Sequence, residues 1–465
     1  MSYMELSQTR LTLRYGIRAM YRDTWLSERR AGVLLKHESA SKDCIEVFSR
    51  SRLVETLRAA SGKIPAYKGM ADDVCHSNVY EVLRRFPIID KAALLERFEQ
   101  YSPPPRHRFF SVSGKTSGTT GTPITMLRSL DSVIWEQAFF TRMFLSSGVP
   151  AGARRAQLRG DEVVPLSRTY PPFWFHNIAN RQLILSSRHL KSKFLPDYIE
   201  ELKRFRPAML QAYPSAAADL AGWLKQSGVY LNIPRIFLNS EPVYPDQREV
   251  IEEQLRGRVF ETYGMAERIA LANECKYGNL HVDADYSHVE ILDQEGNPTA
   301  DWGYVTGTTY FNYMMPLVRY QLSDVTRWKK GACPCGKPFP MIERVTGKYE
   351  DRVFGHDGFP VSPSVITFAF KGVSHIKLAQ VAQTKADLWE VRIVPFPEFG
   401  QEEEKKLVRN IREKVEPAIG LKIVILDDLP RLKSGKFRWV VNEMADAGNS
   451  RRDMESAKLV EQEIE

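Results

Sequence analysis

The sequence predicts an α/β protein with a large N-terminal domain made of several subdomains and a small α+β domain at the C-terminal end. Three observations lead to this prediction. From about residue 183, apolar runs alternate with helical segments, as parallel strands and crossover helices do. Between residues 289 and about 326 the pattern changes to short strands and turns. Beyond a junction near Gly347, strands and helices alternate again.

The N-terminal 105 residues or so have a helical pattern. Apolar residues recur with helical spacing over Ser51 to Ser61 and over Lys91 to Tyr101, and Pro103-Pro104-Pro105 ends the pattern. A glycine-rich loop follows. After it, the spacing over Asp131 to Ser147 predicts another helix.

Short apolar runs predict the strands that follow. In the large domain they cover Met209 to Tyr213, Arg235 to Leu238 and Arg258 to Glu261. In the C-terminal domain they cover Val391 to Val394 and Leu421 to Ile425. Helical segments separate the first three runs, so we expect parallel pairing with crossover helices.

Composition narrows the class of protein. The chain has 465 residues, 43% of them hydrophobic, which is enough for two or three domains with a substantial core. Its net charge of +8 favours acidic ligands such as nucleotides or coenzyme A, while no recognised nucleic-acid module is present. Glu136 and Arg142 interrupt the most apolar helical stretch, so no membrane span is expected. Five cysteines and no signal peptide favour a cytoplasmic enzyme, for which a homodimer is one admissible assembly.

The glycine-rich loop, residues 117–123, is the strongest functional signal. Glycines let the backbone approach phosphate oxygens, and hydroxyl groups can donate to them as charge moves. The alternative is a flexible Ser/Thr/Gly linker. A P-loop is rejected because Phe109 stands where that motif needs glycine. The loop residues in question are Ser117, Gly118, Thr119, Thr120 and Gly121.

Three further segments carry chemistry suited to a nucleotide. Tyr263 could stack on a purine, and Glu267, four residues later, could hold Mg²⁺ against phosphates. Asp324 follows a strand and is suited to accept ribose hydroxyls, although such an aspartate is often only a turn former. Lys436 stands in a loop hinged by Gly435, where its ammonium could neutralise a developing anion, or simply be solvated.

Together these motifs resemble the ANL superfamily of adenylate-forming enzymes over roughly residues 60 to 440. The segments Phe86 to Lys91, Leu210 to Ser215 and Asn239 to Tyr244 are most similar to the phenylacetate-coenzyme A ligase group and its CapK-like relatives. The resemblance implies that a carboxylate attacks the α-phosphate of MgATP, releasing pyrophosphate. The acyl-adenylate is then captured by a second nucleophile, for which we favour coenzyme A.

The resemblance also implies a role for each site residue. It places Ser117, Gly118, Thr119, Thr120 and Gly121 on the phosphates of ATP, Glu241, Glu261, Thr262 and Tyr263 on the adenine side, Asp324 on the ribose and Glu267 on Mg²⁺, with Lys436 as the catalytic lysine.

The resemblance further divides the chain into an adenylation domain, residues 1–347, and a mobile C-terminal lid domain, residues 348–465. Glu350 would be the hinge between the two half-reactions. The family favours arginine where this chain has Lys348. Lysine lacks the planar fork of arginine, which puts the ribose contact at Lys348 in question.

Three cysteines and a histidine supply a candidate structural zinc site. Cys275, His281, Cys333 and Cys335 could close a tetrahedral Zn²⁺ centre, and similar cysteines occur in the ligase group. The alternative is a set of reduced thiols without metal.

Four residues fall in segments that resemble the acyl pocket of the family: Trp174, His176, Tyr213 and Ala266. They would suit an aromatic or otherwise flat acid, although aromatic residues are more often plain core.

The expected function is therefore ATP-dependent activation of a carboxylic acid, most simply aromatic, followed by transfer to coenzyme A. Alternatives within the same chemistry are amide or ester formation, and transfer of AMP itself to a hydroxyl. A non-catalytic nucleotide-binding protein is a further alternative, which Lys348 favours and which Glu267, Asp324 and Lys436 oppose.

Overall fold

The protein is represented by a computed structural model. It describes residues 3–109, 111–115, 124–161, 163–345, 353–358, 360–361, 363–370, 372–429 and 439–444. The chain forms two compact units. The first contains residues 1–116, 124–164 and 168–346, and the second contains residues 117–123, 165–167 and 347–465.

Helices dominate the start of the first unit, as the sequence predicted. Their bounds are α1 (Tyr3–Arg22), α2 (Trp25–His37), α3 (Lys42–Lys63), η1 (Pro65–Tyr67), α4 (Val79–Arg85), α5 (Lys91–Glu96), α6 (Phe98–Tyr101) and η2 (Pro105–His107). Polar side chains cap them: Ser41 accepts from the N–H of Cys44 at 3.2 Å, and Asp90 accepts from that of Ala93 at 2.8 Å. Each cap satisfies a backbone donor that the first turn of its helix leaves without a partner.

A ten-stranded mixed sheet forms the centre of the first unit, with the order β14-β15-β10-β9-β8-β7-β6-β3-β5-β4 among the described residues. The strands are β3 (Arg155–Arg159), β4 (Trp174–Asn177), β5 (Gln182–Ser186), β6 (Met209–Ala212), β7 (Arg235–Asn239), β8 (Arg258–Gly264), β9 (Leu271–Glu274), β10 (Leu280–Val282), β14 (Trp328–Lys329) and β15 (Met341–Ile342). β5, β3, β6, β7 and β8 are parallel, and the remaining strands pair antiparallel to their neighbours.

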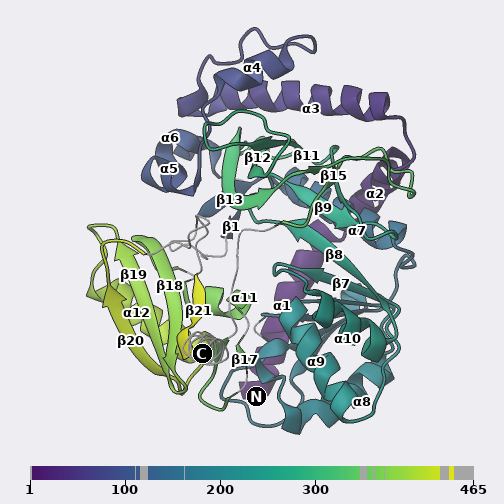
Figure 1. The fold of residues 1–465 in the computed structure, drawn as a ribbon, viewed down its shortest axis with the longest axis vertical. Helices are drawn as coiled ribbons and strands as arrows, with labels where there is room; N and C mark the ends of the chain where they lie inside the picture. The colour runs from purple at the N-terminus through teal and green to yellow at the C-terminus, as the bar shows by residue number, and fades with distance from the viewer. Residues whose placement is uncertain are drawn as a thin grey trace, which may run out of the picture. The chain divides into compact units, whose positions relative to one another are not determined.

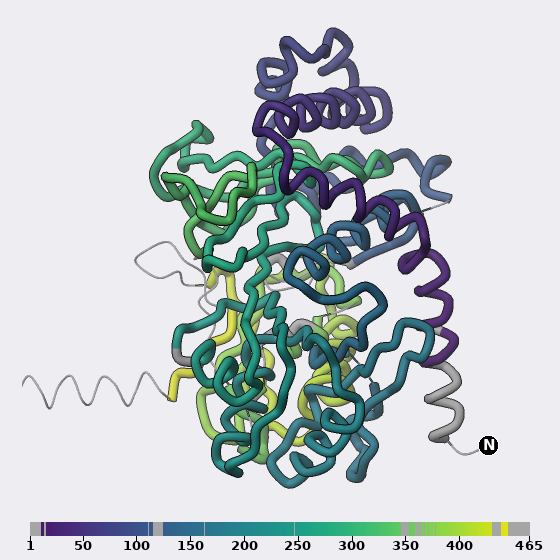
Figure 2. Tube along the Cα trace, turned by 90° about the vertical axis from the view of Figure 1, so that its right-hand side faces the viewer, coloured from purple at the N-terminus to yellow at the C-terminus, as the bar shows by residue number. Residues whose placement is uncertain are grey.

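Helices cover both faces of the parallel strands. They are α7 (Leu130–Ser146), α8 (Leu195–Phe205), α9 (Pro214–Gln226) and α10 (Pro245–Leu255), with the short turns η3 (Ile178–Asn180), η4 (Ser187–His189) and η5 (Ser192–Phe194). α7 packs on one face, where Phe144 meets Phe237 of β7. α9 and α10 lie side by side on the opposite side of the sheet from α1, as the two views together show (Figure 1; Figure 2). The carboxyl ends of the parallel strands therefore share one edge.

Two smaller sheets complete the first unit. β1 (Val112–Lys115) and β2 (Thr125–Arg128) form a hairpin on either side of the predicted phosphate loop. β11 (Ser287–Leu292), β12 (Gly303–Thr309) and β13 (Tyr320–Thr326) form an antiparallel sheet in the region where the sequence predicted short strands. Ile89 pairs with this sheet: its N–H donates to the Arg319 carbonyl at 3.1 Å, and its carbonyl accepts from the N–H of Gln321 at 2.7 Å.

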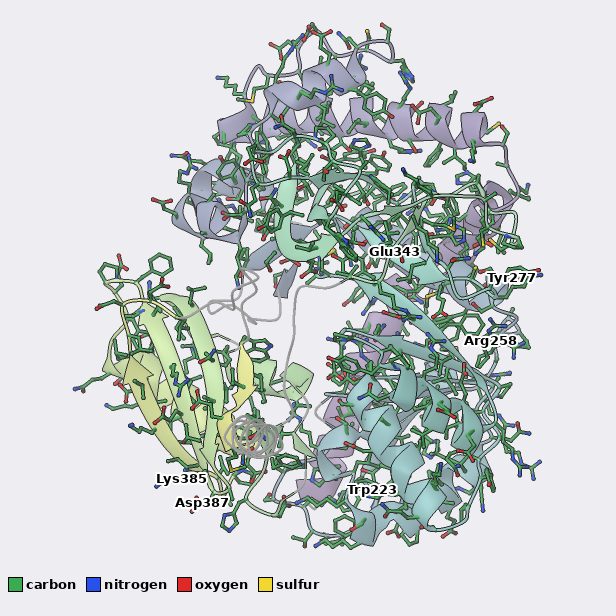
Figure 3. All side chains as sticks on the ribbon, viewed as in Figure 1. Trp223, Arg258, Tyr277, Glu343, Lys385 and Asp387 are labelled. Carbon is green, nitrogen blue, oxygen red and sulfur yellow. The ribbon has the colours of Figure 1, made fainter. Side chains whose placement is uncertain are left out.

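The second unit is an α+β fold around a four-stranded mixed sheet with the order β20-β19-β18-β21. Its elements are β16 (Val353–Phe354), β17 (Pro360–Val361), α11 (Pro363–Ile366), η6 (Thr367–Phe370), β18 (Ile376–Lys385), β19 (Leu388–Pro395), α12 (Gln401–Lys414), β20 (Gly420–Ile425) and β21 (Val440–Asn442). Lys385 and Asp387 mark the turn between β18 and β19 (Figure 3). The buried Trp389 of β19 donates from Nε1 to the Phe354 carbonyl at 3.0 Å. This hydrogen bond connects the two-stranded sheet of β16 and β17 to the four-stranded sheet.

A buried charge network lies where α2, α7 and the sheet of the first unit meet. The Arg142 side chain is 1% exposed and pairs with Asp283 and Asp285, each at 2.7 Å. His37 of α2 approaches Asp285 at 2.8 Å. Because a buried arginine is tolerated only with charged partners, these residues must be placed together.

The structure confirms the predicted elements closely. β6, β7 and β8 begin at the predicted residues, and the predicted helix 131–147 is α7, one residue earlier at each end. The predicted C-terminal strands lie within β19 and β20. Among the described residues, no helix is both long and apolar enough to cross a membrane.

Replacing Arg142 with methionine should lower the free energy of unfolding by about 3–5 kcal/mol, because Asp283 and Asp285 would remain buried without their cation. Denaturation followed by tryptophan fluorescence measures this loss. Arg50→Met is the matched control, since its exposed pair with Glu46 contributes at most about 1 kcal/mol. Equal midpoints for the two variants would contradict the importance of the network.

Candidate functional site

The loops after β6 and β7 meet at the carboxyl edge of the large sheet. The N–H of Ser215, in the first turn of α9, donates to Oε2 of Glu241 at 3.0 Å. Tyr213 precedes α9, and the guanidinium of Arg159 lies 5.2 Å from the centre of its ring. Arg159 also donates to the Ser240 hydroxyl at 3.3 Å. Two segments that carried the family resemblance are thus held together by one carboxylate and one guanidinium.

The next contact joins the large sheet to the three-stranded sheet. Tyr263, near the carboxyl end of β8, donates from its hydroxyl to Oδ2 of Asp324 on β13 at 2.9 Å. Burial, followed by the charge of Asp324, raises the pKa of Tyr263 well above its ordinary value, so the phenol stays protonated and can donate. The structure brings the predicted purine-stacking and ribose-binding residues into direct contact.

Glu261 and Thr262, both on β8, have partners on other elements. Glu261 forms an ion pair with Arg344, which follows β15, and its N–H donates to the buried Glu274 at 2.8 Å. Thr262 is buried and donates to Sδ of Met143 on α7 at 3.2 Å. The Thr262 hydroxyl therefore points to α7. The Glu261 carboxylate binds Arg344, which lies two residues before the end of the first unit.

Ala266 and Glu267 lie in the turn between β8 and β9, three and four residues after Tyr263. The Ala266 carbonyl accepts from Nη2 of Arg128, on β2, at 2.5 Å. Glu267 is partly exposed in this turn. The residue predicted to hold Mg²⁺ thus stands at the same strand end as the predicted purine-stacking residue.

Trp174 and His176 lie on the edge strand β4, apart from this group. Trp174 pairs with Leu185 of β5, and its ring meets Tyr198 of α8 at 5.7 Å. His176 pairs with Leu183, closer to the amino ends of the parallel strands, and its Nε2 lies 3.0 Å from Glu201 of α8. The structure brings Tyr213 and Ala266 to the carboxyl edge, whereas His176 is engaged with α8 at the edge of the sheet.

The remaining predicted site residues fall outside the described residues, and their roles stay predictions. These are Ser117, Gly118, Thr119, Thr120, Gly121, Lys348, Glu350 and Lys436.

The predicted zinc residues do come together. Sγ of Cys275 and Cys333 lie 3.6 Å apart, and Sγ of Cys335 lies 3.3 Å from Nε2 of His281. All four ligand atoms lie within 4.8 Å of one another. Nδ1 of His281 lies 2.9 Å from the Phe339 carbonyl, a contact that directs Nε2 to the sulfurs. The donor set and its spacing fit a tetrahedral zinc ion.

Neighbouring residues donate hydrogen bonds to the sulfurs of this group. Tyr277 lies in the loop between β9 and β10 that begins with Cys275, and Figure 3 shows it near Arg258 on the outer side of the first unit. The N–H of Tyr277 donates to Sγ of Cys275 at 3.4 Å, and Asn279 donates to Sγ of Cys333 at 3.2 Å. Such donors stabilise thiolates, as a metal site requires.

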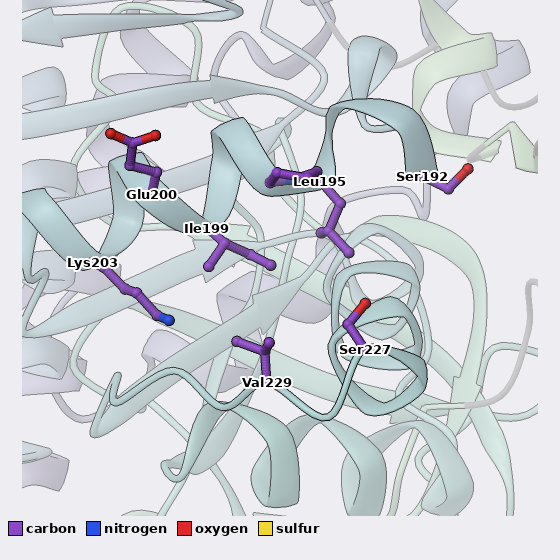
Figure 4. A pocket seen from close by; sticks show the side chains of 8 residues that line it. Ser192, Leu195, Ile199, Glu200, Lys203, Ser227 and Val229 are labelled. Atoms are coloured by element: carbon purple, nitrogen blue, oxygen red, sulfur yellow. The ribbon is translucent and has the colours of Figure 1, made fainter.

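A cavity of about 490 Å³ lies away from the carboxyl edge, between α8 and the loop after α9 (Figure 4). Its lining is Ser192, Leu195, Pro196, Ile199, Glu200, Lys203, Ser227 and Val229. None of the predicted site residues belongs to this lining, so the cavity does not add to the candidate site.

Sequence reasoning missed four arginines that organise the site. Arg268 lies in the turn after β8, Arg128 donates to that turn from β2, Arg159 covers Tyr213, and Arg344 pairs with Glu261. A signal existed for Arg268, which directly follows Glu267. The others are brought in by pairing between distant segments, which no local pattern reveals.

Comparison with known families and proteins points in one direction. The family described as the CapK C-terminal domain matches residues 353–443. Protein CapK of Staphylococcus aureus is 26% identical over 213 residues, covering 45% of this chain and 46% of that protein. A phenylacetate-coenzyme A ligase of Thermus thermophilus is 23% identical over 466 residues, covering 87% of this chain and 98% of that protein.

Solved structures show the same fold. A 2-hydroxyisobutyryl-CoA ligase in complex with 2-HIB-AMP and CoA, in the thioesterification state, has a TM-score of 0.57 at 18% identity and covers 90% of this chain and 94% of its own. The same ligase in the postadenylation state has a TM-score of 0.54, again at 18% identity, with coverages of 90% and 94%.

Tyr263→Phe should lower the free energy of unfolding by about 1.5–3 kcal/mol, because the mostly buried Asp324 carboxylate would lose a charge-assisted hydrogen bond. Chemical denaturation of the purified variant measures this loss. Tyr304→Phe is the control, since the structure gives the Tyr304 hydroxyl no hydrogen bond among the described residues. If both variants unfold like the wild type, the contact between the two sheets contributes nothing.

Proposed function

We propose that this chain, a relative of CapK and the phenylacetate-coenzyme A ligases, activates a carboxylic acid with ATP and transfers the acyl group to coenzyme A. Its fold is that of the ANL adenylate-forming enzymes. One observation carries the proposal. The Tyr263–Asp324 contact lies beside Glu267, at the carboxyl edge of a parallel sheet. Such edges are where open α/β sheets bind ligands.

Each residue of this edge has a defined task in the proposed reaction. The Tyr263 ring supports the purine, while its hydroxyl holds Oδ2 of Asp324. Oδ1 of Asp324, which has no hydrogen bond among the described residues, is left to accept a ribose hydroxyl. Glu267 offers the oxygen ligand that Mg²⁺ prefers, and bound Mg²⁺ supplies positive charge against the phosphates.

Lys436 completes the proposed chemistry. Its ammonium offsets charge that grows on the α-phosphate and the bridging oxygen as the carboxylate attacks. The lysine belongs to the C-terminal unit, so we propose that this unit acts as a lid that turns about Glu350, with Lys348 near the ribose. Residues 117–121 would hold the phosphates of ATP.

The acid we propose is aromatic or flat. Supporting this, Tyr213 lies at the carboxyl edge with its ring against Arg159, and Ala266, a small residue, follows β8 at the same edge. Coenzyme A is favoured as acceptor because the relatives and structural neighbours are named as coenzyme A ligases.

Adenylation is tested by carboxylate-dependent exchange of labelled pyrophosphate into ATP across aryl, fatty and amino acids. Lys436→Ala should reduce exchange by at least about a hundredfold, the scale of losing one transition-state charge contact, while leaving the fold intact. Lys433→Ala, in the same loop, is the matched control. Exchange by Lys436→Ala at the wild-type rate would remove Lys436 from the chemistry.

The acceptor is tested separately, with an acid that supports exchange. AMP release that depends on coenzyme A supports thioester formation. Release that depends on an amine or alcohol assigns an amide or ester synthetase, and AMP bound stably to a hydroxyl assigns AMP transfer. Binding of ATP without exchange for any acid would favour a non-catalytic role.

We also propose that Cys275, His281, Cys333 and Cys335 hold a structural zinc ion. All four tetrahedral positions would be filled by the protein, so no position would be left for catalysis. The residues tie the loop between β9 and β10 to the loop between β14 and β15, and bound zinc would fix both.

Protein purified without chelators should contain about one zinc per chain by elemental analysis. Cys333→Ser and Cys335→Ser should lose the metal and lower the thermal midpoint by several degrees, because metal binding contributes to folding free energy. Cys44→Ser and Cys75→Ser are the controls, since both cysteines are exposed and outside the group. Zinc-free wild-type protein of unchanged stability would remove the site.

A further inference from the structure

Three arginines gather behind the turn that carries Ala266 and Glu267. Arg128 donates to the Ala266 carbonyl at 2.5 Å. Arg268 donates to the Ser132 carbonyl of α7 at 3.0 Å and pairs with Glu136 at 3.3 Å. Arg22, in the last turn of α1, has a buried Nε that no described residue meets with a hydrogen bond.

The backbone is built to admit this group. Gly114 of β1 lies opposite Met126 in the hairpin, and a Cβ at Gly114 would collide with the Arg128 guanidinium. A side chain at position 114 would therefore displace the Arg128 guanidinium from its present position. Arg268 itself adopts a left-handed backbone conformation, with φ of 60°, which turns its side chain to α7.

Positive charge in this group exceeds negative charge. Burial and the neighbouring Arg268 lower the pKa of both Arg22 and Arg128, and Arg18 further lowers that of Arg22. The carboxylates that oppose these effects are Glu136 and Asp23. Among the charges that act on the Arg22 and Arg128 guanidinium groups, the arginines, with Arg18 included, thus outnumber the two carboxylates.

Neither carboxylate is fully available to neutralise the arginines. Oε2 of Glu136 already accepts the Tyr286 hydroxyl at 2.7 Å, and Asp23 is exposed and accepts from Asn180 at 2.7 Å.

Such an excess is costly without an anion. A buried cation that lacks a partner loses its hydration without gaining an equivalent contact. Arg22, Arg128 and Arg268 are nevertheless each partly exposed, so a small anion can reach them. Arginine offers planar pairs of donors that match a carboxylate.

We propose that Arg22, Arg128 and Arg268 bind a second carboxylate of the acid substrate, so that the enzyme activates one end of a dicarboxylic acid. This inference rests on the proposed adenylation and names its substrate class. The location supports an acid rather than the nucleotide. Arg268 lies in the turn after β8 and reaches α7, and Arg128 reaches the same turn from β2, whereas the Tyr263 hydroxyl meets Asp324 on β13.

The test compares diacids with their own monomethyl esters. Terephthalate and adipate are assayed against the monomethyl ester of each in pyrophosphate exchange, with wild type, Arg22→Gln and Arg22→Lys. We expect wild type to prefer the diacids. Arg22→Gln should lose at least about tenfold in kcat/KM for the diacids, the scale of one charge-assisted hydrogen bond, and should be unchanged on the esters. Arg22→Lys should recover part of the loss.

Two results of the pyrophosphate-exchange assay would overturn the inference. A wild type that does not distinguish diacids from esters has no site for the second carboxylate. An equal loss on diacids and esters in Arg22→Gln assigns Arg22 a structural role.

A readout without catalysis separates this inference from the proposed function. The thermal midpoint of the full chain without ATP is measured with terephthalate, adipate, their esters and inorganic phosphate. If no acid supports exchange, the proposed adenylation fails. A rise with the diacids that Arg22→Gln abolishes would still establish the anion site. If only phosphate raises the thermal midpoint, the site does not bind a dicarboxylic acid. If no anion raises it, the three arginines do not form an anion site.

Discussion

The Arg142 network is the constraint on which the arrangement of the first unit depends. One buried guanidinium holds Asp283 and Asp285, and it can be stable only if α7 and the segment before β11 are both in place. Lys337 extends the network through Glu38 at 3.0 Å, from the loop that also carries Cys333 and Cys335. One network of buried salt bridges thus connects α7, the large sheet and the loop that carries Cys333 and Cys335.

Around this network the carboxyl edge of the sheet is assembled from contacts between distant segments. Ile89 forms two backbone hydrogen bonds at the start of β13, and Asp324, further along that strand, accepts from the Tyr263 hydroxyl. Arg344 fixes Glu261 at the point where the chain leaves the first unit. A nucleotide at this edge would meet groups that are already oriented, so that little conformational freedom would be lost on binding.

The sequence was a good guide to strands and a partial guide to the site. Apolar runs such as Arg235 to Leu238 predict strands because burial on both faces of a parallel sheet demands such residues. Tyr263 and Asp324 were assigned related tasks, and they touch. The Arg344–Glu261 pair spans 83 residues and leaves no local trace. The pocket role of His176 stays a prediction; its ring contacts Glu201 and Phe205 on α8, a pairing of distant segments that no local pattern indicates.

The hydrogen bond from Ser215 to Glu241 has a consequence for how such proteins can be recombined. A carboxylate from the loop after β7 satisfies an N–H in the first turn of α9, so each loop completes the other. A chimaera that imported only one of them from a distant homologue would leave a backbone donor uncapped or a carboxylate without its partner. The two loops therefore have to be exchanged together, although 26 residues separate them.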